Sequence, residues 1–464
     1  MNECKIGLLP LYLALYDTAC PEIRPHINEI HAVIADKLRD AGLNLVCAPV
    51  CRVREEFHAA VDAFIQDDVC AVITLHLAYS PSLESIDALC RIEVPIIVLD
   101  TTEAVTFDSR TDPVEIMYNH GIHGVQDMCN LLLRRGKKFF IEAGHYEQSD
   151  VIARVGRLCM AAGAASKMRQ ARVGIVGQPF DGMGDFNVSF EELKATIGIS
   201  VVPFDFGKEN TGRCGGMITD AAIDAEIEDD LSRFEPVAYQ REVHERTARA
   251  SLLLRSWIAE KELTAFSVNF LAIVPGSGFD CMPFLEAGKQ MASGIGYAGE
   301  GDVLTAALTG ALASIYPLAT FTEMFCPDWQ NNAIFLSHMG EININVVAEK
   351  PRLVEKDFPY TEAMNPLVAY GRYMPGKAVL VNLAPVGNGR YSLILSEVEV
   401  LGVEGEDKMA DSVHGWFRPR QPIADFLKQY SLAGGTHHLA MVYGNVMSEL
   451  VPFGEMLGFE VIVI

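Results

Sequence analysis

The sequence predicts an α/β protein in which two doubly wound parallel-sheet domains precede a β-rich C-terminal domain. Up to about residue 316, short apolar runs alternate with helical patterns, which is the order that builds parallel sheets covered by helices. After that point, β-rich runs follow one another with many turns between them. The length of 464 residues fits about three domains. We therefore expect domains at residues 1–170, 171–316 and 317–464.

The composition argues against nucleic-acid and membrane partners. The chain has 37 basic and 61 acidic residues, a net charge of −24, and no basic block that could bind phosphates or anionic lipids. The apolar run at residues 6–16 has too little positive charge before it for a signal peptide, and no later stretch has the length of a membrane span. Eleven scattered cysteines without a Cys-x-x-Cys pair are typical of a reducing compartment, so we expect a cytoplasmic protein.

The first domain is expected to hold a Rossmann-like parallel sheet with candidate binding residues at one edge. Ligands of such sheets collect at the carboxyl ends of the strands, where this sequence has Tyr12, His76, Tyr79, His120 and His123. A hydrogen-bonded loop histidine is the common alternative role for each imidazole. Strands are predicted at residues 6–9, 71–75, 95–99 and 138–142, with helices at 27–41, 54–66 and 125–133.

The second domain is expected to begin with a buried strand at residues 172–177, followed by a glycine-bearing loop at 178–185. This loop matches neither Gly-x-Gly-x-x-Gly nor a Walker sequence with its lysine, so it does not predict a nucleotide site. Helices are predicted at residues 161–170, 220–235 and 239–261, and a further strand at 264–270.

Glu300 lies in a glycine-framed loop, residues 296–302 (GYAGEGD), directly before a predicted helix. The glycines let an ion or a substrate approach the main chain closely. Asp302 takes the N-cap position of the helix, and the free N–H groups of a helix start favour an ionised Glu300. Such a carboxylate can be a metal ligand or a base, although a glutamate in an ordinary turn gives the same pattern.

Two polar side chains of the β-rich domain occupy positions where alternation predicts an apolar face. The two-residue period of a strand places Glu323 on the face of Phe321 and Phe325, and it places His338 on an apolar face as well. A carboxylate among phenylalanines is costly unless a cation or a strong hydrogen bond compensates it. Strands are predicted at residues 319–325, 333–338, 378–383, 391–400 and 438–443.

Two further imidazoles, His437 and His438, follow a glycine pair near the end of the chain. With Glu300, Glu323 and His338, one of them completes a set of two carboxylates and two imidazoles. This set suits a six-coordinate divalent ion, Mn²⁺ most naturally, with positions left for substrate or water, whereas zinc prefers fewer ligands. A structural role explains any one of these residues alone, but the four together predict a metal site.

At these residues the sequence resembles the L-arabinose isomerase family, within the wider group that includes L-fucose isomerase. The family's metal-site segments are similar to residues 296–302, 321–324, 336–339 and 434–438, in the same order and with broadly similar spacing. Weaker similarity at residues 74–81, 119–124 and 144–146 extends the resemblance over nearly the whole chain.

The resemblance implies an aldose–ketose isomerase that acts on a free sugar, an L-arabinose-like pentose or a related hexose, through a cis-enediolate. It implies that Mn²⁺, with Co²⁺ or Mg²⁺ as alternatives, binds to two glutamates that also move the proton and to two histidines. It further implies a homo-oligomer, a hexamer, in which active sites are shared between subunits. The implied metal ligands are Glu300, Glu323, His338 and His438, and the implied sugar-binding residues are His123, which reaches a neighbouring subunit, His437, Tyr12 and His76.

The sequence also departs from the family where the sugar is recognised. The Gln-His-Leu-Tyr of the family is replaced by Pro-Leu-Tyr-Leu at residues 10–13, and its Asp-Tyr after Glu323 by Met324 and Phe325. These changes support an aldose–ketose isomerase more than an arabinose enzyme. The alternatives are a metal-dependent epimerase or lyase acting on a sugar or sugar acid, and a non-catalytic sugar-binding protein. A phosphorylated substrate is disfavoured, because no Arg/Lys cluster accompanies the metal segments.

Overall fold

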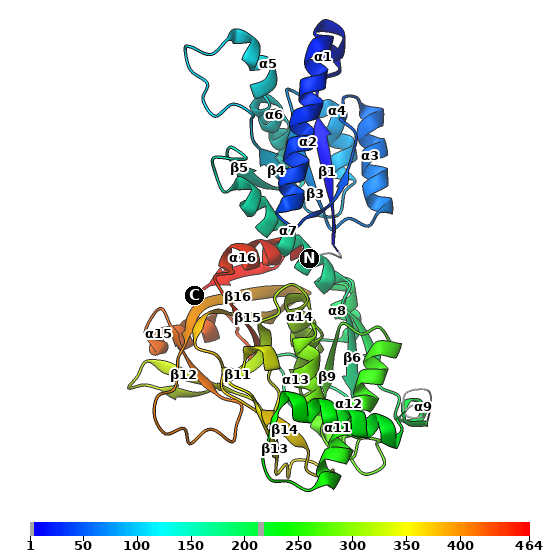
Figure 1. Cartoon of the computed structure of the whole chain (residues 1–464), viewed down its shortest axis with the longest axis vertical. Coiled ribbons are helices and arrows are strands. Elements are labelled where there is room, and N and C mark those ends of the chain that lie inside the picture. The colour runs from blue at the N-terminus through cyan, green and yellow to red at the C-terminus, as the bar shows by residue number, and fades with distance from the viewer. Residues whose placement is uncertain (1–3, 212–217) are drawn as a thin grey trace. The chain divides into compact units, whose positions relative to one another are not determined.

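The structure, a computed structural model, describes residues 4–211 and 218–464 (Figure 1). The chain divides into two compact units, Met1–Ser166 and Lys167–Ile464, and the boundary falls within helix α7 (Val151–Arg169). Parallel α/β sheets and a β-rich C-terminal region are present, as the sequence predicted. The second parallel sheet and the β-rich region belong to one compact unit, so the domain boundary expected at residues 316 and 317 stays a prediction. None of the described helices is long and apolar enough to cross a membrane.

The first unit contains a five-stranded parallel sheet in the order β2-β1-β3-β4-β5. The central strand β3 is buried at every residue, which explains its continuous apolar pattern. Strand β2 was not predicted, because an edge strand of four half-exposed residues has no clear periodicity. The strands are β1 (Lys5–Leu11), β2 (Asn44–Cys47), β3 (Ala71–His76), β4 (Ile96–Asp100) and β5 (Phe140–Ala143). The helices are α1 (Ala14–Ala19), α2 (Arg24–Asp40), α3 (Arg54–Gln66), α4 (Ser82–Cys90), α5 (Ile116–Asn119) and α6 (Ile122–Arg134).

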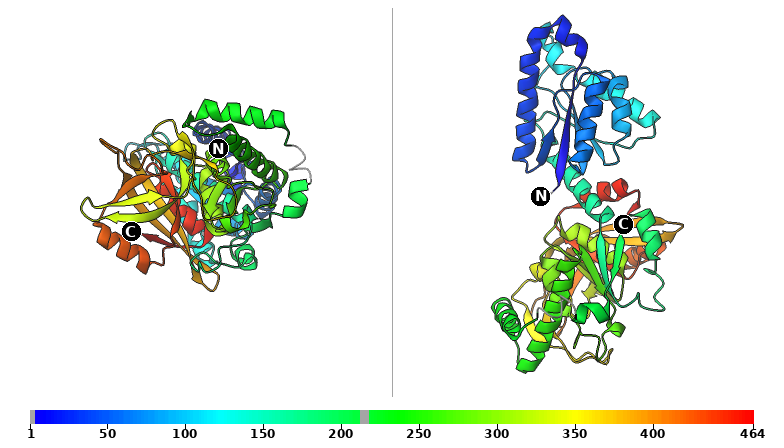
Figure 2. Two further views of the ribbon diagram at one scale, coloured as in Figure 1. Left: turned by 90° about the horizontal axis from the view of Figure 1, so that it is seen from below. Right: turned by 90° about the vertical axis from the view of Figure 1, so that its right-hand side faces the viewer.

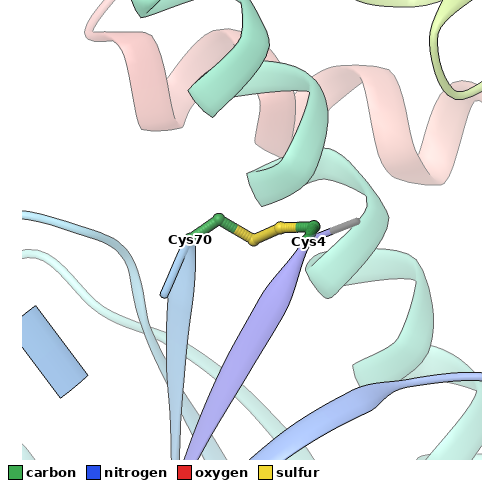
Figure 3. Close-up of a disulfide and its surroundings, with 2 residues drawn as sticks. All are labelled: Cys4 and Cys70. Carbon is green, nitrogen blue, oxygen red and sulfur yellow. A yellow bond between two sulfur atoms is a disulfide. The ribbon is translucent and has the colours of Figure 1, made fainter. Parts of the chain in front are cut away.

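A disulfide joins Cys4 and Cys70, which lie just before β1 and β3 (Figure 3). The two strands are parallel neighbours, so the residues that precede them meet at the same edge of the sheet, with a Cα–Cα distance of 6.2 Å. The scattered cysteines had predicted reduced thiols, and sequence spacing gave no sign of this pair because the residues are 66 positions apart. The other cysteines in the described part of the chain are free.

The second unit begins with a four-stranded parallel sheet in the order β10-β9-β6-β7. Residues 296–299, expected to be loop, form strand β10 instead, because the glycines let it pack closely against helix α14. A Cβ atom at Gly296 would lie 2.3 Å from the carbonyl oxygen of Ala306. The strands are β6 (Arg172–Val176), β7 (Ser200–Pro203), β9 (Ala265–Val268) and β10 (Gly296–Gly299). The helices are α8 (Phe190–Thr196), α9 (Phe206–Thr211), α11 (Asp220–Arg233), α12 (Arg241–Glu260), α13 (Phe284–Ala292) and α14 (Val303–Ala313).

The β-rich region is a closed barrel (Figure 1; Figure 2). Its strands run in the order β15-β18-β11-β12-β17-β16, and pairing of β15 with β16 closes the ring, while β19 adds to β16. A small sheet, β14-β13-β8, lies outside the ring. The six barrel strands are β11 (Ala319–Asp328), β12 (Ala333–Ser337), β15 (Gly376–Gly387), β16 (Arg390–Val400), β17 (Gly415–Pro419) and β18 (His438–Tyr443), and the added strand is β19 (Glu460–Val463). The remaining elements are β8 (Glu235–Pro236), β13 (Arg352–Glu355), β14 (Leu367–Tyr370), α15 (Ile423–Leu432) and α16 (Met447–Leu457).

Candidate metal centre

Glu300 occupies the turn between strand β10 and helix α14. Its backbone carbonyl accepts a hydrogen bond from the N–H of Phe180 at 2.9 Å, and the next N–H, that of Gly301, donates to Ser267 Oγ at 2.9 Å. Asp302 caps the helix as predicted, since its Oδ1 accepts a hydrogen bond from the N–H of Thr305 at 2.9 Å. These bonds attach the turn to strand β9 and to the loop that follows β6, and they fix where the Glu300 side chain begins.

Barrel pairing brings Glu323 and His438 together. Strands β11 and β18 are antiparallel, and their register places Glu323 directly opposite His438. Side chains opposite each other on one face of such a pair lie close together. The predicted face of Glu323 is correct for Phe321, which is buried, but wrong for Phe325, which is 43% exposed. A β-bulge between Met324 and Cys326 interrupts the alternation at that point.

Four side chains meet where the Glu300 turn faces the barrel. Glu300, Glu323, His437 and His438 each offer one potential ligand atom, and these atoms all lie within 4.8 Å of one another. The Nε2 atom of His438 is 3.4 Å from Glu300 Oε2 and 3.2 Å from Glu323 Oε1. The Nε2 atom of His437 is 3.7 Å and 3.6 Å from the same two oxygens. The arrangement has the donor atoms of a divalent metal site.

His338 lies beside this group but is not one of the four. Its ring centroid is 6.0 Å from that of His438, and a Cβ atom added to Gly299 would lie 3.2 Å from its Nε2 atom. The ring is buried, and its Nδ1 atom is 2.7 Å from Glu341 Oε2. Its Nε2 edge therefore passes close to the backbone next to Glu300. The sequence predicted His338 as the fourth metal ligand, whereas the group of four side chains that meet in the structure contains His437 instead.

Each of the three imidazoles has its own carboxylate at Nδ1. Glu341 binds His338, Asp302 Oδ2 lies 3.0 Å from Nδ1 of His438, and Asp185 Oδ2 lies 2.6 Å from Nδ1 of His437. Metal-binding histidines commonly donate their second ring N–H to such an acceptor, which orients the ring. Sequence reasoning missed both Asp185 and Glu341, which contact the imidazoles of the candidate centre. The three-residue spacing after His338 was an available signal for Glu341, whereas nothing local pointed to Asp185.

Charges within the cluster shift the pKa values of its members. Burial raises the pKa of Glu300, but the imidazoles of His437 and His438 outweigh burial, so the pKa lies below its usual value. This agrees with the predicted ionised carboxylate. Burial lowers the pKa of His437, yet the neighbouring carboxylates of Asp185 and Glu300 raise it to about 9. Burial raises the pKa of Asp185, and the hydrogen bonds from His437 bring it down to about 2.

Two buried atoms of the cluster, Glu300 Oε2 and His438 Nε2, have no hydrogen-bond partner among the described residues. Buried polar atoms left unpaired cost about 1–3 kcal/mol each, so native structures usually satisfy them. The two atoms lie 3.4 Å apart. A carboxylate oxygen and an imidazole nitrogen are together a mixed donor set that suits Mn²⁺ or Co²⁺. The residues therefore fit a divalent cation.

The predicted sugar-binding residues of the first unit gather at the carboxyl ends of its strands. Tyr12 directly follows β1, and His76 is the last residue of β3. The two strands are neighbours, and Leu11 of β1 pairs with His76. Within residues 4–211 and 218–464, the Tyr12 hydroxyl and both ring nitrogens of His76 are buried without a hydrogen-bond partner. Burial lowers the pKa of His76 to about 3. His123 is exposed in the first turn of α6.

His120 and Tyr79 lie beside these residues. The Tyr16 hydroxyl is 2.9 Å from His120 Nε2, and the His120 and His123 ring centroids are 6.0 Å apart. Tyr79 directs its hydroxyl to Asp127 at 3.5 Å. The histidines at this edge thus include a neutral buried ring, a hydrogen-bonded ring and an exposed ring that contacts it.

Comparisons with known proteins point to one family. The L-arabinose isomerase central domain matches residues 205–316, and the L-arabinose isomerase C-terminal domain matches residues 318–460. An L-arabinose isomerase of Geobacillus thermodenitrificans (strain NG80-2) is 25% identical over 452 residues, covering 90% of this chain and 86% of that protein. One of Shewanella baltica (strain OS223) is 25% identical over 447 residues, covering 91% and 86%.

A solved structure was also matched. A periplasmic solute-binding protein of an ABC transporter from Actinobacillus succinogenes 130z, with bound D-allose, is 14% identical and covers 68% of this chain and 92% of that chain. Its TM-score of 0.18 is too low to support an argument about fold or ligand.

Proposed function

Because this chain is a divergent member of the L-arabinose isomerase family, we propose that it is a metal-dependent aldose–ketose isomerase acting on a free sugar. The observation that carries the proposal is the cluster of Glu300, Glu323, His437 and His438, whose potential ligand atoms all lie within 4.8 Å of one another. The substrate class is an L-arabinose-like pentose or a related hexose. The similarity to L-arabinose isomerases supports the type of reaction. The different residues at 10–13 support a sugar other than L-arabinose within this class.

The reaction moves a carbonyl group between C1 and C2 of the sugar. One carboxylate takes the proton from C2, which gives a cis-enediolate, and the proton returns at C1 while the hydroxyl proton of O2 passes to O1. We assign Glu300 and Glu323 to these proton transfers, because both are only partly buried and face the same space. A divalent cation bound beside them supplies Lewis-acid stabilisation of the negative charge that develops on the sugar oxygens.

Four residues would hold the cation: Glu300, Glu323, His338 and His438. Mn²⁺ suits this set of oxygen and nitrogen donors, with Co²⁺ or Mg²⁺ as the alternatives. The hydrogen bond from His338 to Glu341 supports its assignment, since it leaves Nε2 available on the side of Glu300. His437 is 37% exposed and is assigned to the sugar pocket. Metal titration of His338→Asn and His437→Asn tests this choice, because only loss of a ligand lowers the metal affinity strongly.

We further propose a cytoplasmic homo-oligomer, a hexamer, in which His123 of one subunit reaches the sugar bound by another. The exposure of His123 supports the idea that it serves a partner molecule. The net charge of −24 supports the absence of nucleic-acid and anionic-membrane partners.

The experiment that tests the function is an assay of chelator-stripped protein against unphosphorylated aldopentoses and aldohexoses, with and without added Mn²⁺. We expect ketose from at least one sugar, formed only when metal is present. A sugar or sugar acid that gives an epimer or an elimination product instead would replace the isomerase with an epimerase or lyase. Sugar binding without any product would identify a non-catalytic binding protein, and failure to bind metal would contradict the site itself.

A further inference from the structure

We propose that Asp185 is a positioning residue of this site, which holds the His437 ring so that Nε2 faces Glu300 and Glu323. The orientation of the ring is a property of the chain alone. Its effect on sugar turnover rests on the proposed isomerase function.

One oxygen of Asp185 binds His437 twice. Oδ2 accepts a hydrogen bond from the backbone N–H of His437 at 3.0 Å, and it lies 2.6 Å from Nδ1 of the same residue. A carboxylate only accepts hydrogen bonds, so Nδ1 carries a proton in this pair. The two bonds fix both the backbone and the ring of His437, and they leave Nε2 on the opposite side of the ring.

Phe186, the residue after Asp185, packs against the same pair of histidines. Phe186 is 3% exposed, and its ring stacks on His438 with a centroid distance of 5.2 Å and an interplanar angle of 12°. It also contacts His437, at a centroid distance of 5.7 Å. Asp185 and Phe186 thus hold both imidazoles that follow the glycine pair at 434–435.

The loop that carries Asp185 is itself tied to the metal centre. The N–H of Phe180 donates to the carbonyl of Glu300 at 2.9 Å, and the Asn269 side chain donates to the carbonyl of Gln178 at 2.7 Å. The glycine-bearing loop at 178–185, which has no nucleotide motif, therefore has a different role here. The loop follows β6 and places the Asp185 carboxylate beside His437, the residue just before β18.

The two imidazoles differ in how much they need such support. The His438 side chain is fully buried, so packing and Asp302 restrict its ring. The His437 side chain is 37% exposed, so packing leaves one side of the ring free. Asp185 supplies the missing restraint, and Nε2 then lies 3.7 Å from Glu300 Oε2 and 3.6 Å from Glu323 Oε1. A sugar bound between the two glutamates, as the proposed function requires, would contact Nε2 at this place.

The first measurement is an NMR spectrum of the metal-free protein with ¹⁵N-labelled histidine. We expect a slowly exchanging Nδ1–H resonance of His437, assigned by its absence in His437→Gln. Asp185→Ala should lose this resonance, whereas Asp185→Asn should retain it because the amide oxygen still accepts the hydrogen bond. Retention of the resonance in Asp185→Ala overturns the proposal. This readout needs neither metal nor turnover, so it stands even if the isomerase assay fails.

The second measurement is steady-state kinetics on the sugar that the wild type converts. Loss of a residue that orients a site histidine costs about 10- to 100-fold, so kcat/KM of Asp185→Ala should fall by that factor, with most of it restored in Asp185→Asn. The matched control is Asp407→Ala, which removes a carboxylate 2.8 Å from His414 Nε2 outside the centre and should leave kcat/KM unchanged. An unchanged kcat/KM in Asp185→Ala, or no recovery in Asp185→Asn, overturns the positioning role.

Discussion

Glu300 combines an uncommon backbone conformation with a side chain that belongs to the candidate metal cluster. Its φ is 62°, in the left-handed region that costs most non-glycine residues about 1–3 kcal/mol. The N–H of Glu300 donates to Val268 at 3.0 Å and its carbonyl accepts from Phe180, so neighbouring segments impose the conformation. Residues in such conformations cluster at functional sites. The sequence predicted a glycine-framed loop around Glu300. Only the structure shows that Glu300 itself, and not just a glycine, has a positive φ.

Replacing either site glutamate by glutamine should stop turnover without unfolding the protein. Glu300→Gln and Glu323→Gln remove the group that accepts the proton while keeping its shape, so we expect kcat to fall by about 10²- to 10⁴-fold. Circular dichroism and thermal unfolding check the fold, and Glu404→Gln at an exposed position is the control. Near wild-type turnover in either variant would remove that residue from the proton transfer.

Gly299→Ala tests whether His338 belongs to the metal centre. The added Cβ would lie 2.9 Å from His338 Cε1, closer than real contacts allow, so the ring must move. We expect the Mn²⁺ affinity to fall about 10-fold, since small displacements of a ligand or its supports have effects of this size. Isothermal titration measures the affinity. Gly156→Ala, where the new Cβ meets nothing within 4 Å, is the control, and equal affinities would argue against His338 as a ligand.

At the scale of elements, helices α11, α12 and α13 are joined by a buried network of charges. Lys289 is 5% exposed and lies 2.7 Å from Asp230, while Arg255 binds both Glu226 and Glu286. A helix as acidic as α11 ordinarily exposes its charged face to solvent. The structure shows that Glu226 and Asp230 of this helix are buried instead, because cations from α12 and α13 pair with them.

The network predicts a loss of stability in acid. Burial raises the pKa of Glu226, but Arg255 and Lys289 outweigh it and lower the pKa from 4.5 to about 2. A carboxylate whose pKa is lower in the folded state stabilises the protein fully above its unfolded value and progressively less as pH falls toward the folded value. We therefore expect the free energy of unfolding to fall between pH 4.5 and pH 2.

The variant that isolates this effect is Glu226→Gln. Denaturant unfolding should show the wild type losing more stability than the variant between pH 5 and about pH 2.5, because the variant has no carboxyl to protonate at this position. Glu404→Gln, at an exposed position, should follow the wild type. Parallel pH profiles of the wild type and Glu226→Gln would contradict the role of Glu226.

At the scale of the whole molecule, the proposed sharing of active sites can be tested by mixing defective subunits. His123→Ala should lower activity, and so should Glu300→Gln, but hybrid oligomers formed from the two should regain part of it. In a hybrid, an intact metal centre of one subunit meets an intact His123 of another. Leu133→Ala, an exposed change on the same helix, is the control and should retain full activity. A complete absence of recovery in verified hybrids would contradict shared sites.

Local patterns determined much of this protein. Periodicity placed most strands and helices, including α3 at residues 54–66. The residue types at 300, 323, 338 and either 437 or 438 were enough to suggest a metal site. Such signals are local, because the period of about 2 residues in a strand or about 3.6 in a helix shows only which face of one element is buried. The sequence analysis could therefore identify candidate side chains for the chemistry.

The tertiary structure decided which of these residues meet. Closure of the barrel, the strand at 296–299 and the disulfide between Cys4 and Cys70 depend on partners far away in the chain. Asp185 reaches His437 across 252 positions, and no periodic pattern encodes that contact. Strand pairing and packing bring distant segments together, so the partners of the chemical residues emerge only when the whole chain folds.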